Sequence, residues 1–242
     1  MLQKKVCVLY HIFYEDTIAY LPGQLQALKG FEPLYFFNIC AETPNQDAIK
    51  DYLHDEFPTA YITVSSNRGK DIGAKLLLLD LCLKTNSEPE WFLFLHDKKS
   101  LQALSAKSWK NELLKIIDPS VLPAISQWLS RPENYGIIAA KNYVVKEPLQ
   151  GNTFTGQNGA IIQTLLANYA IPCVNPDYVA GTMFWCKATY LMAFFRKNDP
   201  LAIRSTLESG NVLDNFSGTQ THSWERLLSW IGLSGDLMIK TV

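Results

Sequence analysis

The chain has 242 residues, of which 48% are hydrophobic, 12% aromatic and 19% charged. This composition supplies enough apolar material for the core of one large domain and excludes a chain that is mostly disordered. The formal net charge of -1 at pH 7 excludes recognition of nucleic acid through a general excess of lysine and arginine, so any anion-binding site must be local.

Strands and helices are expected to alternate over the first 140 residues. Short apolar runs rich in β-branched and aromatic residues predict strands, and longer runs with a period near 3.6 predict helices. This alternation is typical of an α/β fold, in which parallel strands are joined by helices that cover both faces of the sheet. The predicted strands are 4–12, 33–40, 60–66, 91–95 and 135–140, and the predicted helices are 17–28 (started or interrupted near Pro22), 45–57, 72–84 and 106–117.

From about Lys141 the alternation gives way to a long polar stretch, 141–159, which we interpret as a functional loop. No internal repeat or low-complexity segment is present, and the chain 1–242 fits one large domain or two intimate ones. The elements predicted after the loop are a helix near 160–169, a strand over 180–187, and helices over 188–197 and 223–233.

Cysteine usage and the N-terminus predict the compartment. The five cysteines lack CxxC spacing, and three lie in apolar runs, where a thiol behaves as a small core hydrophobe. No signal peptide is recognised, and no apolar run approaches the roughly 20 residues of a membrane span. We therefore expect a soluble protein of the cytoplasm that can still sit on a membrane surface.

The third predicted strand ends in the polar stretch "NRGKDIG", residues 67–73. In open α/β sheets, ligands bind outside the carboxyl ends of the strands, where helix N-termini offer free amide donors to an anion. The glycines permit close backbone approach, the cations offer charge, and the amide and carboxylate can bind hydroxyl groups. The alternative is a turn in which Asp71 caps a buried helix and the cations are merely solvated. The candidate binding residues are Asn67, Arg68, Gly69, Lys70 and Asp71.

The fourth predicted strand also runs directly into polar residues, in "WFLFLHDKKS". A carboxylate at this place can bind a divalent cation or a ribose, and two adjacent lysines can neutralise a diphosphate. A solvated loop, with the histidine bonded to backbone, is the alternative. The candidates here are His96, Asp97, Lys98 and Lys99.

Five short motifs follow one another along the chain: "SSNRGKDIG", "FLFLHDKKS", "YGIIAAKNY", "AGTMFWCKATYL" and "THSWERLL". Together, from "VLYHIFYED" onward, they make the chain resemble the rhamnan synthesis protein F family of glycosyltransferases, which act in bacterial surface polysaccharide assembly. The resemblance implies a single Rossmann-like domain with the A-type glycosyltransferase fold. It also implies transfer, with inversion, of rhamnose or another deoxyhexose from a nucleotide sugar of the dTDP-rhamnose type to a glycan or lipid-linked glycan.

By position, the resemblance implies a nucleotide-sugar-binding half over about 1–140 and an acceptor and catalytic half over about 141–242. Within the first half, residues 67–71 would hold the nucleotide and diphosphate, and the turn 96–100 would lie beside the transferred sugar. The resemblance also implies a cytoplasmic protein at the inner face of the membrane.

One feature departs from the A-type pattern, in which an Asp-x-Asp at this strand end commonly holds a metal. Asp97 is followed by Lys98 and Lys99, so the second carboxylate is missing. Two cations beside one carboxylate disfavour a divalent ion and can stabilise the departing diphosphate themselves. We therefore expect activity without Mg²⁺ or Mn²⁺; if an ion is used, Asp97 and His222 are its expected ligands.

The stretch "AGTMFWCK" is a candidate substrate contact. Its small residues Gly181 and Thr182 would let a substrate approach, and Trp185 offers a ring on which a sugar can stack. In the alternative, the aromatic residues of this stretch fill the core. Tyr14, Glu15 and Asp16, which follow the first strand at the same sheet edge, can contact the base or ribose or lie in an exposed turn.

Inverting transfer needs a base that takes the proton of the acceptor hydroxyl. The C-terminal third supplies Glu208, Asp214, His222 and Glu225 as catalytic candidates, with His222 orienting the acceptor or diphosphate. On a helix beginning near residue 221, His222 and Glu225 share a face. Glu225 can instead pair with Arg226 or a nearby lysine, or cap its own first turn.

Two other functions remain open from the sequence. A non-catalytic glycan-binding or scaffolding relative would keep Trp185 and the basic turns but would tolerate loss of the base. A nucleotide-binding hydrolase would need a positioned nucleophile or a pair of metal carboxylates, and the sequence indicates neither.

Overall fold

The structure, a computed structural model, describes residues 5–97, 112–130, 134–172, 175–214, 217–235 and 237–242. Its centre is a seven-stranded sheet in the order β11-β5-β10-β4-β1-β2-β3. Only β10 runs antiparallel to its neighbours within this sheet. The strands are β1 (Val6–Ile12), β2 (Leu34–Cys40), β3 (Tyr61–Ser65), β4 (Trp91–His96), β5 (Tyr135–Ala139), β10 (Phe184–Lys187) and β11 (Met238–Thr241).

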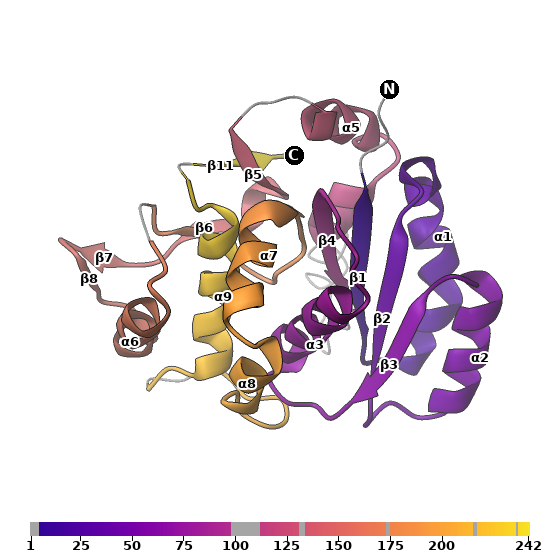
Figure 1. Cartoon of the computed structure of the whole chain (residues 1–242), viewed down its shortest axis with the longest axis horizontal. Helices are drawn as coiled ribbons and strands as arrows, with labels where there is room; N and C mark the ends of the chain where they lie inside the picture. The colour runs from indigo at the N-terminus through magenta and orange to yellow at the C-terminus, as the bar shows by residue number, and fades with distance from the viewer. Residues whose placement is uncertain (1–4, 98–111, 131–133, 173–174, 215–216, 236) are drawn as a thin grey trace.

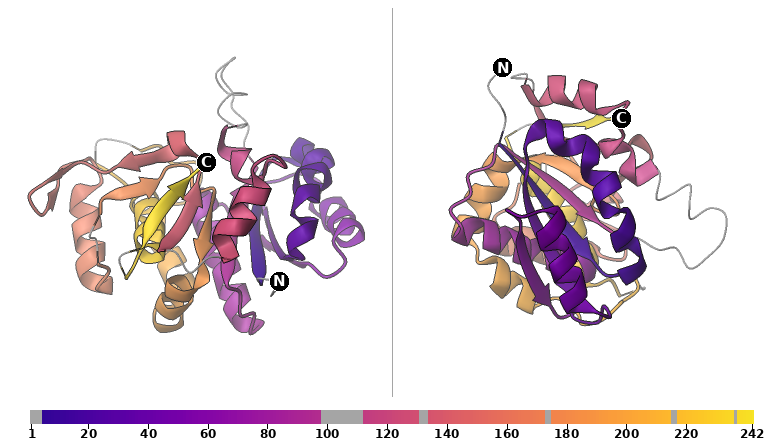
Figure 2. Two further views of the ribbon diagram at one scale, coloured as in Figure 1. Left: turned by 90° about the horizontal axis from the view of Figure 1, so that it is seen from above. Right: turned by 90° about the vertical axis from the view of Figure 1, so that its right-hand side faces the viewer.

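Helices cover both faces of the sheet (Figure 1), and the two further views show the same layering (Figure 2). The predicted α/β class is therefore confirmed, and the mostly parallel sheet is consistent with a Rossmann-like glycosyltransferase fold. The helices are α1 (Leu21–Leu25), α2 (Gln46–Glu56), α3 (Lys70–Lys84), α5 (Leu122–Ser130), α6 (Gly159–Tyr169), α7 (Ala188–Lys197), α8 (Pro200–Ser205) and α9 (Gln220–Gly232), with 3₁₀ turns η1 (Glu15–Tyr20), η2 (Gln26–Phe31), η3 (Leu114–Ile117) and η4 (Lys141–Tyr143).

The core forms two layers because side chains alternate across a strand. In β4, Phe92 and Phe94 join the layer under α3, α6, α7 and α9. Trp91, Leu93 and Leu95 join the layer under α1, α2, η3 and α5. All six residues of β4 are buried, which explains its nearly uninterrupted apolar sequence.

Several predicted elements differ in detail from the observed ones. The predicted helix 17–28 is one α-helical turn between two 3₁₀ turns, with Pro22 in the first turn of α1. The predicted helix 106–117 lies largely outside the described residues, apart from η3. The short elements α5, α8 and β11 were not predicted, because an isolated run of four to nine residues gives only a weak periodic signal.

The predicted loop 141–159 contains more structure than expected. Its strand β6 (Val144–Lys146) pairs with β9 (Asp177–Val179), and β7 (Leu149–Gln150) pairs with β8 (Thr153–Phe154) in a short hairpin. The hairpin extends away from the central sheet beside α6 (Figure 1). Among the helices that the structure describes, none combines the length and apolar composition required to cross a membrane.

The strand order reverses direction beside β1. The chain places β2 and β3 on one side of β1 and β4 on the other, and His11 of β1 lies opposite His96 of β4 in the register. In open α/β sheets, such a switch point forms a crevice outside the carboxyl ends of the strands. A ligand site is therefore expected where β1 and β4 end.

Candidate functional site

A cavity of about 320 Å³ lies at this switch point. Its volume is at the lower end of the range for small-molecule sites. Five of the predicted binding residues line it together, although they come from two separate stretches of the sequence: Asn67, Lys70, Asp71, His96 and Asp97. Tyr14, the candidate after the first strand, lines it too, and the remaining lining residues are His11, Phe13, Asn211 and Leu213.

A buried ion pair stands at the edge of the cavity. Lys75, whose relative exposure is 0%, lies one turn after Asp71 on α3 and its Nζ donates to Asp71 Oδ2 at 2.6 Å. The Thr182 hydroxyl donates to the same oxygen at 2.5 Å and accepts a hydrogen bond from Lys75. His96 completes this Asp71–Lys75 cluster, with Nδ1 at 3.6 Å from Asp71 Oδ2.

The Asp71–Lys75 cluster holds its carboxylate ionised. Burial opposes ionisation of Asp71, but the Lys75 ammonium, His96 and the hydrogen bonds hold the pKa of Asp71 well below its usual range. Burial lowers the pKa of Lys75, against the attraction of Asp71. Within the described residues, the contacts of the Asp71 carboxylate with Lys75, Thr182 and His96 all end on Oδ2, so Oδ1 retains its capacity to accept a hydrogen bond from a ligand.

Two residues around this cluster have a left-handed backbone that is unusual for a side chain with a Cβ. Lys70 has φ 52° and Thr182 has φ 46°. This conformation is a genuine outlier for a β-branched residue such as threonine, and strain of this kind gathers at functional sites. The strained backbone therefore supports the assignment of this region as a site.

Asp97 fixes the loop that follows β1. Its carboxylate accepts hydrogen bonds from the backbone N–H groups of Phe13 and Tyr14 at 2.7 to 3.0 Å and from the Thr17 hydroxyl at 2.9 Å. Both oxygens are thus engaged by protein donors. Across the described residues, no group of three or more His, Cys, Asp or Glu side chains is arranged to hold a metal ion.

The candidates Arg68 and Gly69 are not among the residues that line the cavity; both pack against the segment around Leu207. The Arg68 guanidinium donates to the Leu207 carbonyl at 2.6 Å and the Ser205 carbonyl at 3.3 Å. A Cβ on Gly69 would lie 2.2 Å from Leu207 Cδ1. The close approach that this glycine permits is therefore between two segments of the protein.

The same region is joined by backbone hydrogen bonds. The Gly69 N–H donates to the Glu208 carbonyl, and the Gly210 N–H donates to the Asn67 carbonyl, both at 2.7 Å. Lys70 extends this connection, because its Nζ donates to the Val212 carbonyl at 3.3 Å. The two pairings bring Asn211 and Leu213, which are far away in the sequence, to the cavity.

His11 and Asn67 are two further polar side chains in the cavity lining. Burial lowers the pKa of His11 to about 4, although its Nδ1 lies within bonding distance of the Asn38 carbonyl and side chain. The Nδ2 of Asn67 donates to Glu42 and Asn211. Its buried Oδ1 has no hydrogen-bond partner in the described part of the chain, and such an oxygen calls for a donor from a ligand or water.

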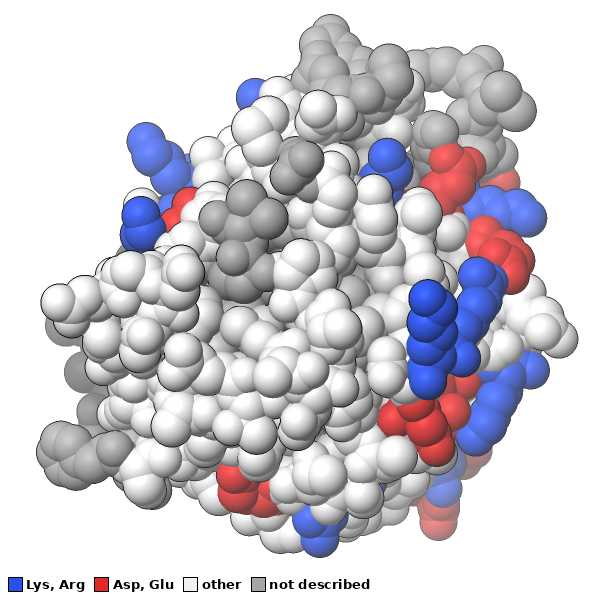
Figure 3. Space-filling view, turned by 60° about the vertical axis from the view of Figure 1, so that its left-hand side comes forward, with Lys and Arg blue, Asp and Glu red and all other residues white. Residues whose placement is uncertain are grey.

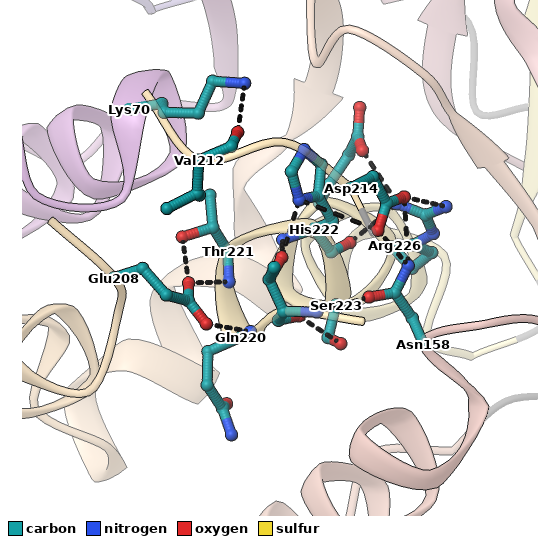
Figure 4. A network of polar contacts seen from close by, with 12 residues as sticks. Lys70, Asn158, Glu208, Val212, Asp214, Gln220, Thr221, His222, Ser223 and Arg226 are labelled. Carbon is teal, nitrogen blue, oxygen red and sulfur yellow. Dashed lines mark hydrogen bonds and ion pairs between the residues drawn. The ribbon is translucent and has the colours of Figure 1, made fainter. Parts of the chain in front are cut away.

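Glu208 holds the start of α9, as Figure 4 shows. Its carboxylate accepts from the backbone N–H of Gln220 at 2.7 Å and from the N–H and hydroxyl of Thr221 at 2.9 and 2.6 Å. Burial acts to raise the pKa of Glu208, but these hydrogen bonds lower it overall. Its contacts are those of a residue that stabilises a helix N-terminus.

Asp214, another candidate carboxylate, lies beside Arg226 (Figure 4). Arg226 contacts Glu147 at 3.0 Å, Glu225 at 2.9 Å and Asp214 at 3.7 Å. Asn158 donates to both oxygens of Asp214 at 3.0 and 3.1 Å. This Arg226 cluster therefore places three carboxylates around one guanidinium.

His222 lies beside this cluster on the first turn of α9 (Figure 4). Its Nδ1 is 2.6 Å from the Thr219 hydroxyl and 3.9 Å from Asp214 Oδ1. Burial lowers the pKa of His222, which favours the neutral ring, although Asp214 opposes that effect.

Glu225 connects the two clusters. Its Oε1 accepts from the Gly181 N–H at 2.7 Å, and Gly181 directly precedes Thr182 of the Asp71–Lys75 cluster. Burial raises the pKa of Glu225, although Arg226 and the Gly181 N–H act in the opposite direction. The predicted candidate Gly181 thus contacts a catalytic candidate, Glu225, and Thr182 contacts a binding candidate, Asp71; their contact with substrate stays a prediction.

Trp185 does not reach the cavity, and the prediction that a sugar stacks on it is wrong. Its relative exposure is 0%, and it packs in the layer under α1, α2 and α5. Its indole N–H donates to the Ile116 carbonyl at 2.9 Å. The side-chain alternation of β10 points it to the face opposite the Arg226 cluster.

Some predicted site residues lie outside the described part of the chain, and some observed site residues were not predicted. Lys98 and Lys99 lie outside the described residues. His11 and Lys75 were missed, although a titratable residue inside an otherwise apolar run is a recognisable signal of a paired buried charge. Asn211 and Leu213 carry no local signal, because only the long-range backbone pairing brings them to the cavity.

A family model for rhamnan synthesis protein F matches residues 1–236 of the chain. The search of curated proteins found no match.

Proposed function

Because the chain belongs to the rhamnan synthesis protein F family, we propose that it is a nucleotide-sugar-dependent glycosyltransferase of polysaccharide synthesis. It transfers rhamnose or another deoxyhexose from a nucleoside diphosphate donor, of the dTDP-rhamnose type, to a growing glycan or lipid-linked glycan. The transfer inverts the configuration at the anomeric carbon.

The observation that carries the proposal is the cavity at the switch point of the sheet. Lys70 and the first amide groups of α3 offer a cation and free donors to a diphosphate. The vacant lone pairs of Asp71 Oδ1 and Asn67 Oδ1 suit ribose or sugar hydroxyls. Phe13 and Tyr14 supply aromatic surface for the base at the other side.

The reaction requires one proton transfer and one displacement. The acceptor hydroxyl gives its proton to Glu225 while its oxygen forms a bond to the anomeric carbon, and the bond from that carbon to the diphosphate oxygen breaks. A carboxyl whose pKa is raised by burial suits this role, because it accepts the proton more readily than an ordinary glutamate. Asp214 is the second candidate base.

Charge on the leaving diphosphate is offset by cations of the protein. Lys70 lies at the cavity, and Lys98 and Lys99 follow β4 in the sequence. This part of the proposal predicts activity in the presence of excess chelator, because lysine side chains can replace the role of a divalent ion at the leaving group.

The test measures release of nucleoside diphosphate from a panel of nucleotide sugars, with and without a glycan acceptor. Release that depends on the acceptor supports the transferase. Release without an acceptor would identify a hydrolase, and glycan binding without release from any donor would identify the non-catalytic relative.

A further inference from the structure

A long uncharged segment distinguishes one face of the molecule. Residues 148–176 contain no lysine, arginine, aspartate, glutamate or histidine, although 19% of the chain is charged. The described part of this segment forms the β7–β8 hairpin and α6. The space-filling view that brings this side forward shows charged side chains mainly along its right edge, with a few at the upper left and at the bottom and a broad uncharged area between them (Figure 3).

A groove of about 380 Å³ lies at the end of this segment, against α7 and the last turn of α9. Three aromatic residues line it: Tyr169, Tyr190 and Phe194. The Tyr169 and Phe194 rings lie 6.0 Å apart, and the Tyr169 ring also packs edge-on against buried Trp224 at 5.3 Å. Packing therefore holds these rings in place before any ligand arrives.

The groove combines ring surface with spare hydrogen-bonding groups. Within the described residues, neither the Tyr169 nor the Tyr190 hydroxyl has a hydrogen-bond partner. Asn198, also in the lining, uses its Nδ2 to donate to the Phe194 carbonyl at 3.1 Å, which leaves its carbonyl oxygen for a ligand. Lys197 at one end is the charged residue of the lining.

This chemistry favours one kind of occupant. Ring faces pack against the C–H groups of a sugar, while phenol and amide groups pair with its hydroxyls. Lys197 is a single cation in this lining, and one cation without a basic cluster gives little electrostatic attraction to nucleic acid or anionic lipid. A stable protein partner would need about 800 Å² of complementary surface, or roughly 20 to 30 residues, from this chain, whereas eleven residues line the groove.

We propose that the groove between α6 and α7 binds a neutral glycan, at a place separate from the donor cavity. Its lining includes Ile231 in the last turn of α9 and Ser234 just beyond it. The first residue of this 13-residue helix, Gln220, is instead bonded to Glu208, whose carbonyl pairs with Gly69 next to the donor cavity. The two places are thus about 20 Å apart along α9. Binding here needs no donor, so the inference goes beyond the proposed function.

Calorimetric titration with a linear neutral rhamnose oligosaccharide tests the proposal. The double substitution Tyr169→Ala and Tyr190→Ala should weaken binding at least tenfold, because two ring faces and two hydroxyls are lost. The matched control is Tyr20→Ala, which removes a 68% exposed tyrosine from η1 and should leave the affinity unchanged.

A second pair of variants guards against misfolding. Tyr169→Phe and Tyr190→Phe keep both rings and should each weaken binding about two- to fivefold through loss of one hydroxyl. Unchanged affinity in these folded variants, or no binding of the neutral oligosaccharide to the unmodified chain, would overturn the proposal. Preferential binding of a hyaluronan oligosaccharide or of phosphatidylcholine vesicles at the same tyrosines would also overturn it.

The catalytic variant Glu225→Gln separates this proposal from the proposed function. It should lose transfer and retain the oligosaccharide. A groove that binds glycan in a chain without transferase activity would support this inference and contradict the proposed function. Transferase activity in a chain whose groove binds no glycan would support the proposed function and contradict this inference.

Discussion

The Asp71–Lys75 and Arg226 clusters lie close together on one side of the sheet, yet they balance charge differently. The first pairs one carboxylate with one ammonium and a histidine. The second surrounds one guanidinium with three carboxylates. A balanced pair keeps its ionisation over a wide pH range, whereas an excess of buried carboxylate makes one member easier to protonate.

This difference indicates two separate tasks. The Asp71–Lys75 cluster presents a fixed charge at the cavity and so is suited to positioning a ligand. The Arg226 cluster contains Glu225, whose pKa is raised by burial, and so is suited to proton transfer.

The largest effect is expected from Glu225→Gln. The amide keeps the shape of the side chain but cannot accept the proton, so turnover should fall roughly 100- to 10,000-fold while donor affinity stays nearly the same. Initial rates and donor titrations measure the two quantities. Glu208→Gln is the control, because Glu208 is engaged at the start of α9. If Asp214→Asn alone abolishes turnover, the base is Asp214.

The next largest effect is expected from Lys75→Met, which leaves the Asp71 carboxylate without its buried partner. The free energy of unfolding should fall by about 3 to 5 kcal/mol, as when one member of a buried ion pair is removed. Chemical denaturation measures it. Lys84→Met breaks a pair with the same spacing on the same helix, Asp80–Lys84, but Lys84 is 63% exposed. Equal losses in the two variants would contradict a special role for the buried pair.

A smaller effect is expected on donor binding. Lys70→Ala should weaken donor affinity by roughly 1.5 to 3 kcal/mol, because it removes a charge-assisted contact at the cavity. Arg68→Ala should leave that affinity unchanged, because Arg68 donates to the carbonyls of Leu207 and Ser205. Calorimetry with the nucleoside diphosphate compares them, and an Arg68 variant weakened as much as the Lys70 variant would place the diphosphate elsewhere.

The smallest effect is expected in the pH dependence of stability, where the two clusters should act in opposite directions. The pKa of Asp71 is lowered on folding, so its contribution is present above the unfolded value near pH 3.9 and is lost as the pH falls through the folded value. The pKa of Glu225 is raised, so stability falls as the pH rises from about 4.3 through the folded value.

Denaturation midpoints measured from pH 4 upward test the second half of this prediction. Glu225→Gln should remove the fall in stability that accompanies ionisation of Glu225. If stability depends on pH in the same way in the variant and in the unmodified chain, folding does not raise the pKa of Glu225.

Local sequence patterns predicted the cavity residues at the ends of β3 and β4, but not Asn211 and Leu213, which line the cavity from the C-terminal part of the chain. Asn67, Lys70 and Asp71 were recognisable because polar and glycine residues interrupt two apolar runs at a strand-to-helix junction. Trp185 was misassigned because the direction of a side chain depends on the register of β10 between its neighbours. Asn211 reaches the cavity through backbone pairing with a segment more than 140 positions earlier, which no local pattern encodes.

The insertion of β10 between β4 and β5 has a consequence for synthesis of the chain. β4 and β5 are complete by residue 139, yet each pairs with β10, whose last residue is Lys187. While the ribosome makes the intervening residues, both strands present an unpaired edge, and an open edge is a template for pairing with another chain. Nascent chains halted in this interval should therefore be the ones that most need chaperones.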